Sequence, residues 1–239
     1  MLELPTDLPA DLAPLSWLIG VWEGTGVIDY HVGDHHFAGE FTHRVSFSHD
    51  GGPYLNYAAT GWFVRPASSL AEPVEAREES ASPDAEPGSP DTERGSPDAE
   101  PVEAPPVSAS VPLVAETGFW RIARPATPAD AGPALLPPAE DGPVRTVDDV
   151  EELRVASGGF PLEVSIAHSD GSLELYLGEI AGPRIDIATD AIVRGAGGKH
   201  YAAATRMYGL VDSHLLWAWD IAALGSELAS HASARLARV

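Results

Sequence analysis

Residues 162–177 read LEVSIAHSDGSLELYL and carry the pattern that recurs through the folded part of this chain. Apolar and polar side chains alternate on both sides of Ser169-Asp170-Gly171. That alternation is typical of two half-buried strands joined by a tight Asp-Gly turn. The stretch therefore predicts a β-hairpin whose strands cover residues 162–167 and 173–177.

The same alternation extends outward in both directions. Val45, Phe47, Leu55 and Tyr57 flank a turn at residues 50–52 and predict a second hairpin. Further strands are expected over residues 117–122, 185–188, 191–194, 202–208 and 215–221. Turn signals at roughly eight- to twelve-residue spacing favour an all-β antiparallel sandwich or barrel. An up-and-down barrel of about eight to ten strands closes its own edges and encloses one small ligand. Only residues 12–18, with Pro14 near the start, predict a short N-terminal helical turn.

Two proline-rich segments interrupt this pattern. Residues 71–110 hold eleven acids, two arginines and eight prolines, and Ser-Pro-Asp recurs there three times. Such a composition cannot bury an apolar face, so a disordered acidic loop is expected at about 68–111. Residues 124–149 predict a second long loop. We therefore expect one domain over residues 1–239 with two insertions. A docking tail for a basic partner is the alternative for the acidic segment.

Charge and composition exclude several classes of function. Fourteen Lys and Arg against 36 Asp and Glu give a net charge of −22, and cysteine is absent. Disulfides, thiolate ligands and cysteine nucleophiles are thereby excluded. The negative charge disfavours nucleic acid and anionic membrane surfaces. The N-terminus lacks the basic region of a secretory signal. We expect a cytoplasmic protein with a small-molecule ligand, and the sequence leaves its oligomeric state open.

Residues 20–26, GVWEGTG, follow the pattern G-x-W-x-G-x-G. A dinucleotide-binding fingerprint needs a preceding strand and a following helix, whereas a strand-like VIDY follows here. The motif instead predicts that Trp22 plugs the closed end of a barrel and that the glycines let the backbone pass tightly. Contact between Trp22 and a ligand is the alternative.

The chain has nine histidines. A cluster of three near residue 40 and a single histidine in the last segment could each bind a metal. His35, His36 and His43 do not favour zinc, because adjacent residues on a strand face opposite ways. His231 begins the last segment, where counting by twos places it on one face with Ser233 and Arg235. A histidine on an inward face near a barrel rim can ligate haem iron. A solvated or hydrogen-bonded histidine is the alternative, and His168, beside a tight turn, is expected to be solvated.

Several segments together resemble the nitrobindin family of haem-binding barrels, which are similar to fatty-acid-binding proteins. They keep the family's order and cover nearly all of the folded part. The matching segments are residues 14–26 (PLSWLIGVWEGTG), 45–49 (VSFSH), 116–121 (ETGFWR), 185–190 (IDIATD), 199 with 206–210 (RMYGL), 216–220 (LWAWD) and 231–239 (HASARLARV). The two proline-rich loops look like additions to the family pattern.

The resemblance implies a ten-stranded antiparallel barrel that binds haem b near its open end. It implies that His231 is the iron's protein ligand and that Lys199 lies at the haem. It also implies ferric haem that binds nitric oxide and isomerises peroxynitrite to nitrate. The family commonly continues its glycine motif into Tyr-Pro-Thr-Ile, with the threonine beside the haem. This chain has Tyr30-His31-Val32-Gly33, so Val32 takes the threonine position.

Two other functions are compatible with the same residues. One is a haem-free barrel that binds a small apolar molecule. The other is a haem carrier or nitric oxide sensor that uses His231 without turnover. Isomerisation at a ferric haem needs no acid–base pair or nucleophile from the protein, and the sequence shows no convincing triad, so no catalytic side chain is expected.

Overall fold

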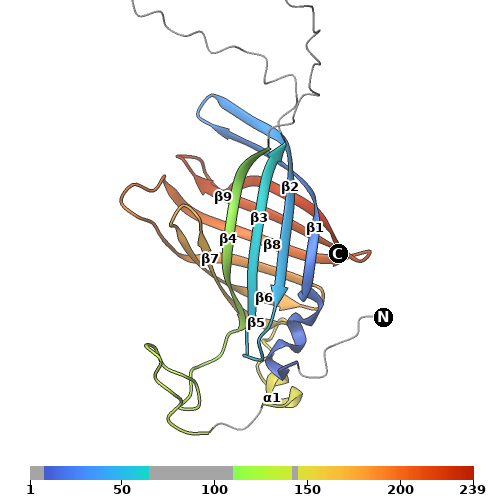
Figure 1. The fold of residues 1–239 in the computed structure, drawn as a ribbon, viewed down its shortest axis with the longest axis vertical. Helices are drawn as coiled ribbons and strands as arrows, with labels where there is room; N and C mark the ends of the chain where they lie inside the picture. Colours follow the sequence, from blue (N-terminus) through green and yellow to red (C-terminus); the bar gives the residue numbers. More distant parts are fainter. Residues whose placement is uncertain (1–7, 65–109, 142–144) are drawn as a thin grey trace, which may run out of the picture. The chain divides into compact units, whose positions relative to one another are not determined.

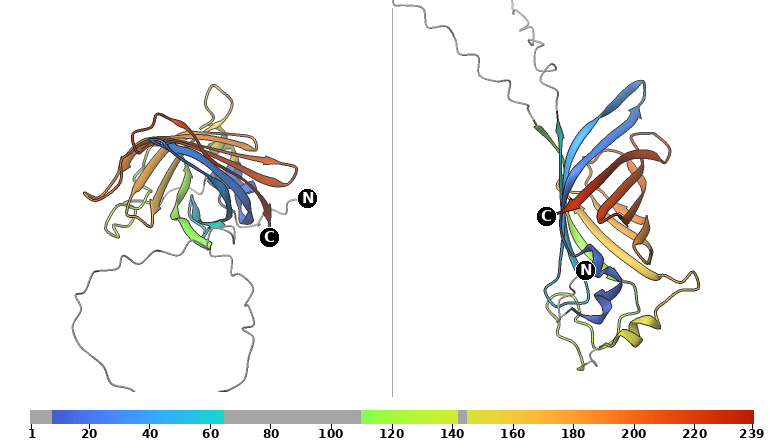
Figure 2. Two further views of the ribbon diagram at one scale, coloured as in Figure 1. Left: turned by 90° about the horizontal axis from the view of Figure 1, so that it is seen from above. Right: turned by 90° about the vertical axis from the view of Figure 1, so that its right-hand side faces the viewer.

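The computed structural model describes residues 8–64, 110–141 and 145–239. Ten antiparallel strands pair in chain order, and β1 closes the barrel by pairing with β10 (Figures 1 and 2). The strands are β1 (Gly20–Val32), β2 (His35–Ser48), β3 (Leu55–Val64), β4 (Ser110–Ile122), β5 (Phe160–His168), β6 (Leu173–Ala181), β7 (Arg184–Val193), β8 (Tyr201–Val211), β9 (His214–Ala223) and β10 (Ala229–Arg238). The predicted all-β ten-stranded barrel is confirmed.

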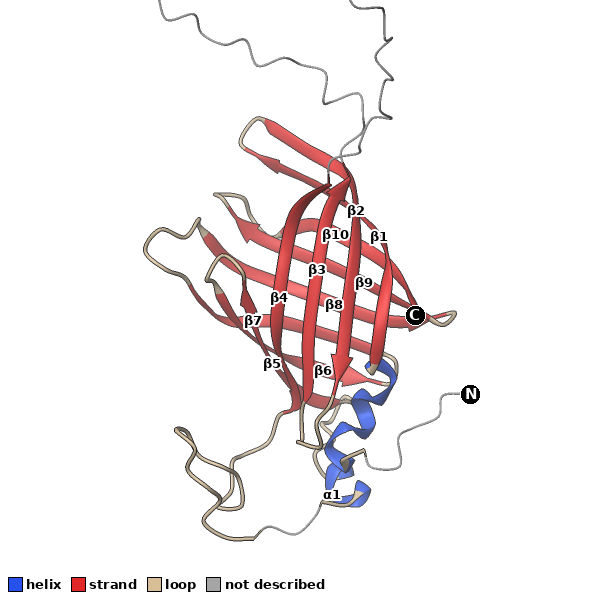
Figure 3. Cartoon of the chain, viewed as in Figure 1, coloured by secondary structure: helices blue, strands red, loops and turns tan. Residues whose placement is uncertain are grey.

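Two short helices accompany the strands: a 3-10 helix, η1 (Ala10–Leu18), and α1 (Val147–Glu151) (Figure 3). The first confirms the helical turn predicted at residues 12–18. The second was not predicted. It begins at a capping box in which the Thr146 and Asp149 side chains each bond the other's backbone N–H. No helix within the described residues is long and apolar enough to cross a membrane.

Three predicted boundaries were wrong. The strands expected at residues 185–188 and 191–194 form a single strand, β7. The register of β7 against β6 shifts between Leu175 and Tyr176, so the break in alternation does not end the strand. The strand expected at 117–122 begins at Ser110, so residues 110 and 111 of the expected acidic loop belong to β4. The rest of that loop lies outside the described residues. The second loop ends at α1 rather than at residue 149.

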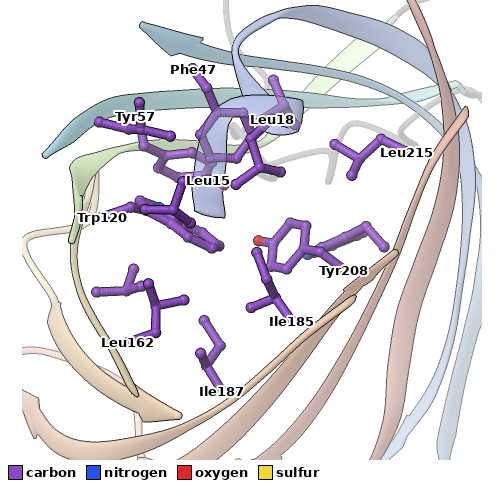
Figure 4. Close-up of a cluster of buried hydrophobic side chains, with 14 of the residues drawn as sticks. Leu15, Leu18, Phe47, Tyr57, Trp120, Leu162, Ile185, Ile187, Tyr208 and Leu215 are labelled. Atoms are coloured by element: carbon purple, nitrogen blue, oxygen red, sulfur yellow. The ribbon is translucent and has the colours of Figure 1, made fainter. Parts of the chain in front are cut away.

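Trp22 plugs one end of the barrel, as predicted. Its side chain is 1% exposed, and its indole N–H donates to the Leu18 carbonyl at the end of η1 over 2.7 Å. Leu12, Leu15 and Leu18 of η1 are fully buried. Figure 4 shows Leu15 and Leu18 lying over a cluster of core side chains that includes Trp120 and Tyr208. Helix η1 therefore closes this end of the barrel.

The glycine motif lets the first and last strands approach closely. A Cβ atom added at Gly24 would lie 2.2 Å from the Arg235 carbonyl oxygen, and one at Gly26 would lie 2.6 Å from the Phe41 ring. Any side chain at Gly24 would collide with the backbone of β10. The prediction that these glycines permit tight passage of the backbone is confirmed at the seam between β1 and β10.

Strand order also determines where a ligand site can form. In an up-and-down barrel the connections β1–β2, β5–β6, β7–β8 and β9–β10 lie at the end opposite η1. Large apolar side chains fill the half of the barrel nearest η1 (Figure 4). The described structure therefore leaves the end formed by these connections as the place for a cavity.

Candidate functional site

A cavity of about 320 Å³ opens at this end of the barrel. Its volume falls at the low end of the range for small-molecule sites, roughly 300–1,000 Å³. Most of its wall is apolar or aromatic. The main wall residues are Ile28 and Tyr30 of β1, Phe41 of β2, Trp217, Trp219 and Ile221 of β9, and Ala232 of β10. Strand β4, at residues 113–115, and the connections β5–β6, β7–β8 and β9–β10 complete the lining.

His231 lies in the wall of this cavity because β10 is irregular there. Ala232, Ala234 and Leu236 face the interior, while Ser233 and Arg235 are exposed. Simple alternation would thus turn His231 outward. A register shift between Ser230 and Ala232 inserts His231 as an extra residue opposite β9. Such a β-bulge re-aims a side chain, and here it places the imidazole at the cavity beside Ala232.

The surroundings of His231 favour its neutral form. Burial lowers the pKa of His231 from 6.5 to about 4. Its ring stacks on Tyr30 with the centroids 4.0 Å apart and meets the Trp219 ring edge-on at 5.4 Å. Neither ring nitrogen has a hydrogen-bond partner among the described residues. His231 is therefore a neutral imidazole with an uncommitted lone pair, as a metal ligand must be.

Three histidines within the described residues line the cavity, and the other two differ from His231. The prediction that His168 is solvated was wrong. Its Nε2 lies 2.7 Å from a Glu174 oxygen and its Nδ1 lies 3.5 Å from a Glu116 oxygen. Burial opposes the charged form, but these carboxylates raise the pKa of His168 above 6.5. His200 is exposed at the rim. Of the three, only His231 combines neutrality with shielding from water.

Lys199 lies at the mouth of the cavity, in the loop between β7 and β8. The Arg194 guanidinium braces this loop by donating to the Lys199 carbonyl oxygen over 2.6 Å. Arg194, Lys199 and His200 all line the rim. The structure thus brings Lys199 and His231 to one cavity and gathers basic side chains at its opening.

Val32 is not among the described residues that line the cavity. It lies at the end of β1, on the same face of the strand as Ile28 and Tyr30, and is half-buried. Its assignment to the cofactor site stays a prediction. Tyr30 is the β1 residue that contacts His231, and the sequence interpretation missed it. Counting by twos from the buried Trp22 would have placed Tyr30 on the inner face.

A buried ionic network lies beside the cavity, and the sequence interpretation missed this as well. The Arg206 guanidinium bonds both oxygens of Glu116 over 2.8 and 2.9 Å and one oxygen of Glu174 over 3.2 Å. Burial opposes ionisation of Glu116, but Arg206 outweighs it and lowers the pKa of Glu116 to about 2. Arg206 also lies over the Trp219 ring, 4.7 Å from its centre. This network could have been found from the charged residues at inward-facing positions of two strands, Glu116 in β4 and Arg206 in β8.

The β1–β2 hairpin places His36 beside His31 and not beside His43. His31 and His36 are register partners whose rings stack with centroids 4.4 Å apart and planes within 13°. Lone pairs lie in the ring planes, so two nearly parallel rings do not aim them at one ion. Over residues 8–64, 110–141 and 145–239, no group of three His, Asp or Glu side chains is placed to hold a metal ion.

Comparisons with known proteins bear on this site. A family model described as "THAP4-like, heme-binding beta-barrel domain" matches residues 11–238. The chain is 50% identical over 238 residues to a protein named peroxynitrite isomerase from Leifsonia xyli subsp. xyli, spanning all of this chain and 99% of that one. It is 47% identical over 239 residues to a protein of the same name from Clavibacter michiganensis subsp. michiganensis, spanning 100% of both.

A solved structure supports the fold. The crystal structure of Rv2717c from M. tuberculosis superposes with a TM-score of 0.55 over 99% of each chain at 20% sequence identity, so that likeness concerns the fold alone. The family model and the relatives at 47–50% identity span nearly the whole chain. This protein therefore belongs to the THAP4-like heme-binding β-barrel family, the nitrobindin family that its sequence segments resemble.

Proposed function

We propose that this protein binds one haem b in the cavity at the open end of the barrel, through His231, and isomerises peroxynitrite to nitrate. Membership of a heme-binding family and relatives named peroxynitrite isomerase support the proposal. The observation that carries it is the placement of His231. Its imidazole is turned into an apolar cavity by a β-bulge, is neutral, and has no competing hydrogen-bond partner within the described residues.

The cavity suits a flat, largely apolar cofactor with acidic edge groups. Aromatic and aliphatic side chains of β1, β2 and β9 would cover the faces of a porphyrin. Arg194 and Lys199 at the rim would pair with its propionates through charge-assisted bonds. In a chain of net charge −22, these basic side chains also offset the repulsion of an anionic cofactor at the mouth.

The residues of this chain would hold the cofactor and limit the access of water, while the cofactor would supply the reactive chemistry. When bound, ferric haem supplies a Lewis-acidic iron that polarises the peroxo group of peroxynitrite and favours its rearrangement to nitrate. His231 would hold the iron. His168 is tied to Glu174 and Glu116 and is not free to bind a metal, so it would not compete with a substrate for the cofactor. The apolar wall limits the access of water to the reacting atoms.

Hemin titration of the apoprotein tests the cofactor assignment. The native protein is expected to give a sharp Soret band at one equivalent, and His231→Ala is expected to abolish it. His200→Ala is the matched control, because His200 lines the same cavity but is exposed. A native Soret band in His231→Ala would remove the basis of the proposal.

Stopped-flow decay of peroxynitrite tests the activity. The hemin-loaded protein is expected to accelerate the decay and to raise the yield of nitrate relative to nitrite, and the hemin-free protein is expected to do neither. Hemin binding without acceleration would instead support a haem carrier or a nitric oxide sensor at the same site. Absence of hemin binding would favour a barrel for an apolar ligand.

A further inference from the structure

Two aromatic rings pack against the His231 imidazole. The Tyr30 ring stacks on it with the centroids 4.0 Å apart and the planes at 28°. The Trp219 ring meets it at 5.4 Å and 76°. Metal-binding histidines usually donate their second ring N–H to an oxygen atom, and that bond fixes the orientation of the ring. No such acceptor is present among the described residues, so aromatic contact is what restricts rotation of His231.

Each of the two rings has its own support. Tyr30 is the register partner of Phe37 across the β1–β2 hairpin, and their rings stack with centroids 5.3 Å apart. Trp219 lies against the Arg206 guanidinium, which both oxygens of Glu116 hold in place. Buried bidentate pairs of this kind fix geometry strongly. Both rings are therefore held by neighbours other than His231.

We propose that Tyr30 and Trp219 are positioning residues that clamp the His231 imidazole so that one ring nitrogen points into the cavity. This inference rests on the proposed function, because it presumes that His231 binds haem iron. Tyr30 acts through its ring: its hydroxyl has no hydrogen-bond partner within the described residues. Phenylalanine should therefore replace Tyr30, whereas an aliphatic side chain of similar size should not.

The clamp has a consequence for the bond to iron. An acceptor on the second nitrogen makes a histidine ligand more basic, and an undonated N–H leaves it less so. His231 should accordingly form a weaker bond to iron than a histidine paired with a carboxylate. The orientation of that bond depends on ring contacts, so loss of one ring should broaden the range of orientations as well as loosen the haem.

Two measurements on the hemin-loaded protein test the clamp. One is the rate of hemin transfer to excess apomyoglobin. The other is the iron–histidine stretching band of the ferrous protein by resonance Raman spectroscopy. Tyr30→Leu is expected to release hemin about tenfold faster and to broaden or shift the band, because supporting residues of metal ligands contribute about 10- to 100-fold to affinity. Tyr30→Phe is expected to behave like the native protein in both measurements.

Each result decides between distinct conclusions. Native behaviour of Tyr30→Leu would overturn the clamp but leave the proposed function intact, provided that His231→Ala still loses hemin. Equal loss in Tyr30→Leu and Tyr30→Phe would overturn it too, since the hydroxyl would then be the active group. A native Soret band in His231→Ala would remove both proposals. Should Tyr30→Leu fail to fold as apoprotein, Tyr30→Met replaces it with the same expectations.

Discussion

The imidazole of His231 lies among side chains that disfavour its charged form. Its pKa is lowered to about 4 by burial, against an ordinary value of 6.5. The unfolded chain therefore binds more protons at this residue between these two values. The same burial that keeps the nitrogen lone pair available for iron also makes the apoprotein sensitive to acid.

The free energy of unfolding of the apoprotein should fall as the pH is lowered from 6.5 to about 4, in part because of His231. Relative to His231→Gln, the native protein should lose about 2 kcal/mol over that interval. Urea unfolding at a series of pH values measures the difference. Parallel pH profiles for the two proteins would contradict the assigned environment of His231.

The effect of His168 on the pH dependence of stability should be opposite to that of His231, so His168 serves as an internal control. Burial opposes its charged form, but Glu174 and Glu116 raise its pKa above 6.5. The stabilisation it contributes is fully present below pH 6.5 and is lost as the pH rises through its pKa in the folded protein. The advantage of the native protein over His168→Gln should therefore shrink as the pH rises, in the same urea experiments.

The bulge in β10 directs the His231 side chain into the cavity, which a regularly paired strand would not do. Ser230 pairs with Asp220 and Ala232 pairs with Trp219, which leaves His231 as the extra residue. Deletion of Ser230 should restore regular pairing and place His231 on the outer face with Ser233 and Arg235. The variant should keep a thermal midpoint close to that of His231→Ala and should lose the Soret band in hemin titration.

A native Soret band in the Ser230 deletion would show that another feature sets the direction of the imidazole. Deletion of Gly51 is the matched control. Gly51 lies in the β2–β3 connection, at the end of the barrel nearest η1, and a Cβ added there meets nothing within 4 Å. Shortening the chain at that position should leave hemin binding through His231 in place.

The strands could be predicted from sequence, whereas the bulge could not. Alternation at residues 162–166 specifies β5, because Leu162, Val164 and Ile166 are buried and a slip by one residue would expose all three. In β6 the alternation predicts the strand but not its inner face, since Leu173 and Leu177 are exposed while Glu174 and Tyr176 are buried. His231 breaks that rule: counting by twos groups it with Ser233 and Arg235, which are exposed. Its inward placement follows from pairing with a neighbouring strand, which local sequence does not encode.

The buried network escaped prediction for a related reason. Glu116 and Arg206 are separated by 90 residues, and each alone reads as a polar residue in a strand. Their pairing depends on β4 and β8 facing each other across the barrel interior. By contrast, the plug formed by Trp22 could be predicted, because η1 and β1 are adjacent in sequence.

The barrel as a whole is expected to tolerate removal of residues 65–109. Val64 and Ser110 are register partners on β3 and β4, so a two-residue turn can join them. Replacing residues 65–109 by Asn-Gly should raise the free energy of unfolding by about 3 kcal/mol, since a shorter connection costs less closure entropy. Hemin affinity should be unchanged. Weaker hemin binding would show that the replaced segment contributes to the site.

The ionic network ties distant parts of the barrel into one acid-sensitive unit. Glu116 on β4 receives bonds from Arg206 on β8 and from the Tyr57 hydroxyl on β3 over 2.7 Å. Burial would raise the pKa of Glu116, but Arg206 lowers it from 4.5 to about 2. Its contribution to stability is therefore present above pH 4.5 and is lost as the pH falls towards 2.

Glu116→Gln should destabilise the protein by about 3 kcal/mol at neutral pH, because Glu174 is then the one carboxylate partner among the described residues for the fully buried Arg206 charge. The variant should also lose less further stability between pH 4.5 and pH 2 than the native protein loses. Glu23→Gln is the control: Glu23 pairs with Arg44 in solvent, and such pairs contribute at most about 1 kcal/mol. If both variants unfold alike in urea, the network stabilises neither the barrel nor Trp219, and Arg206 does not anchor the Trp219 ring of the clamp on His231.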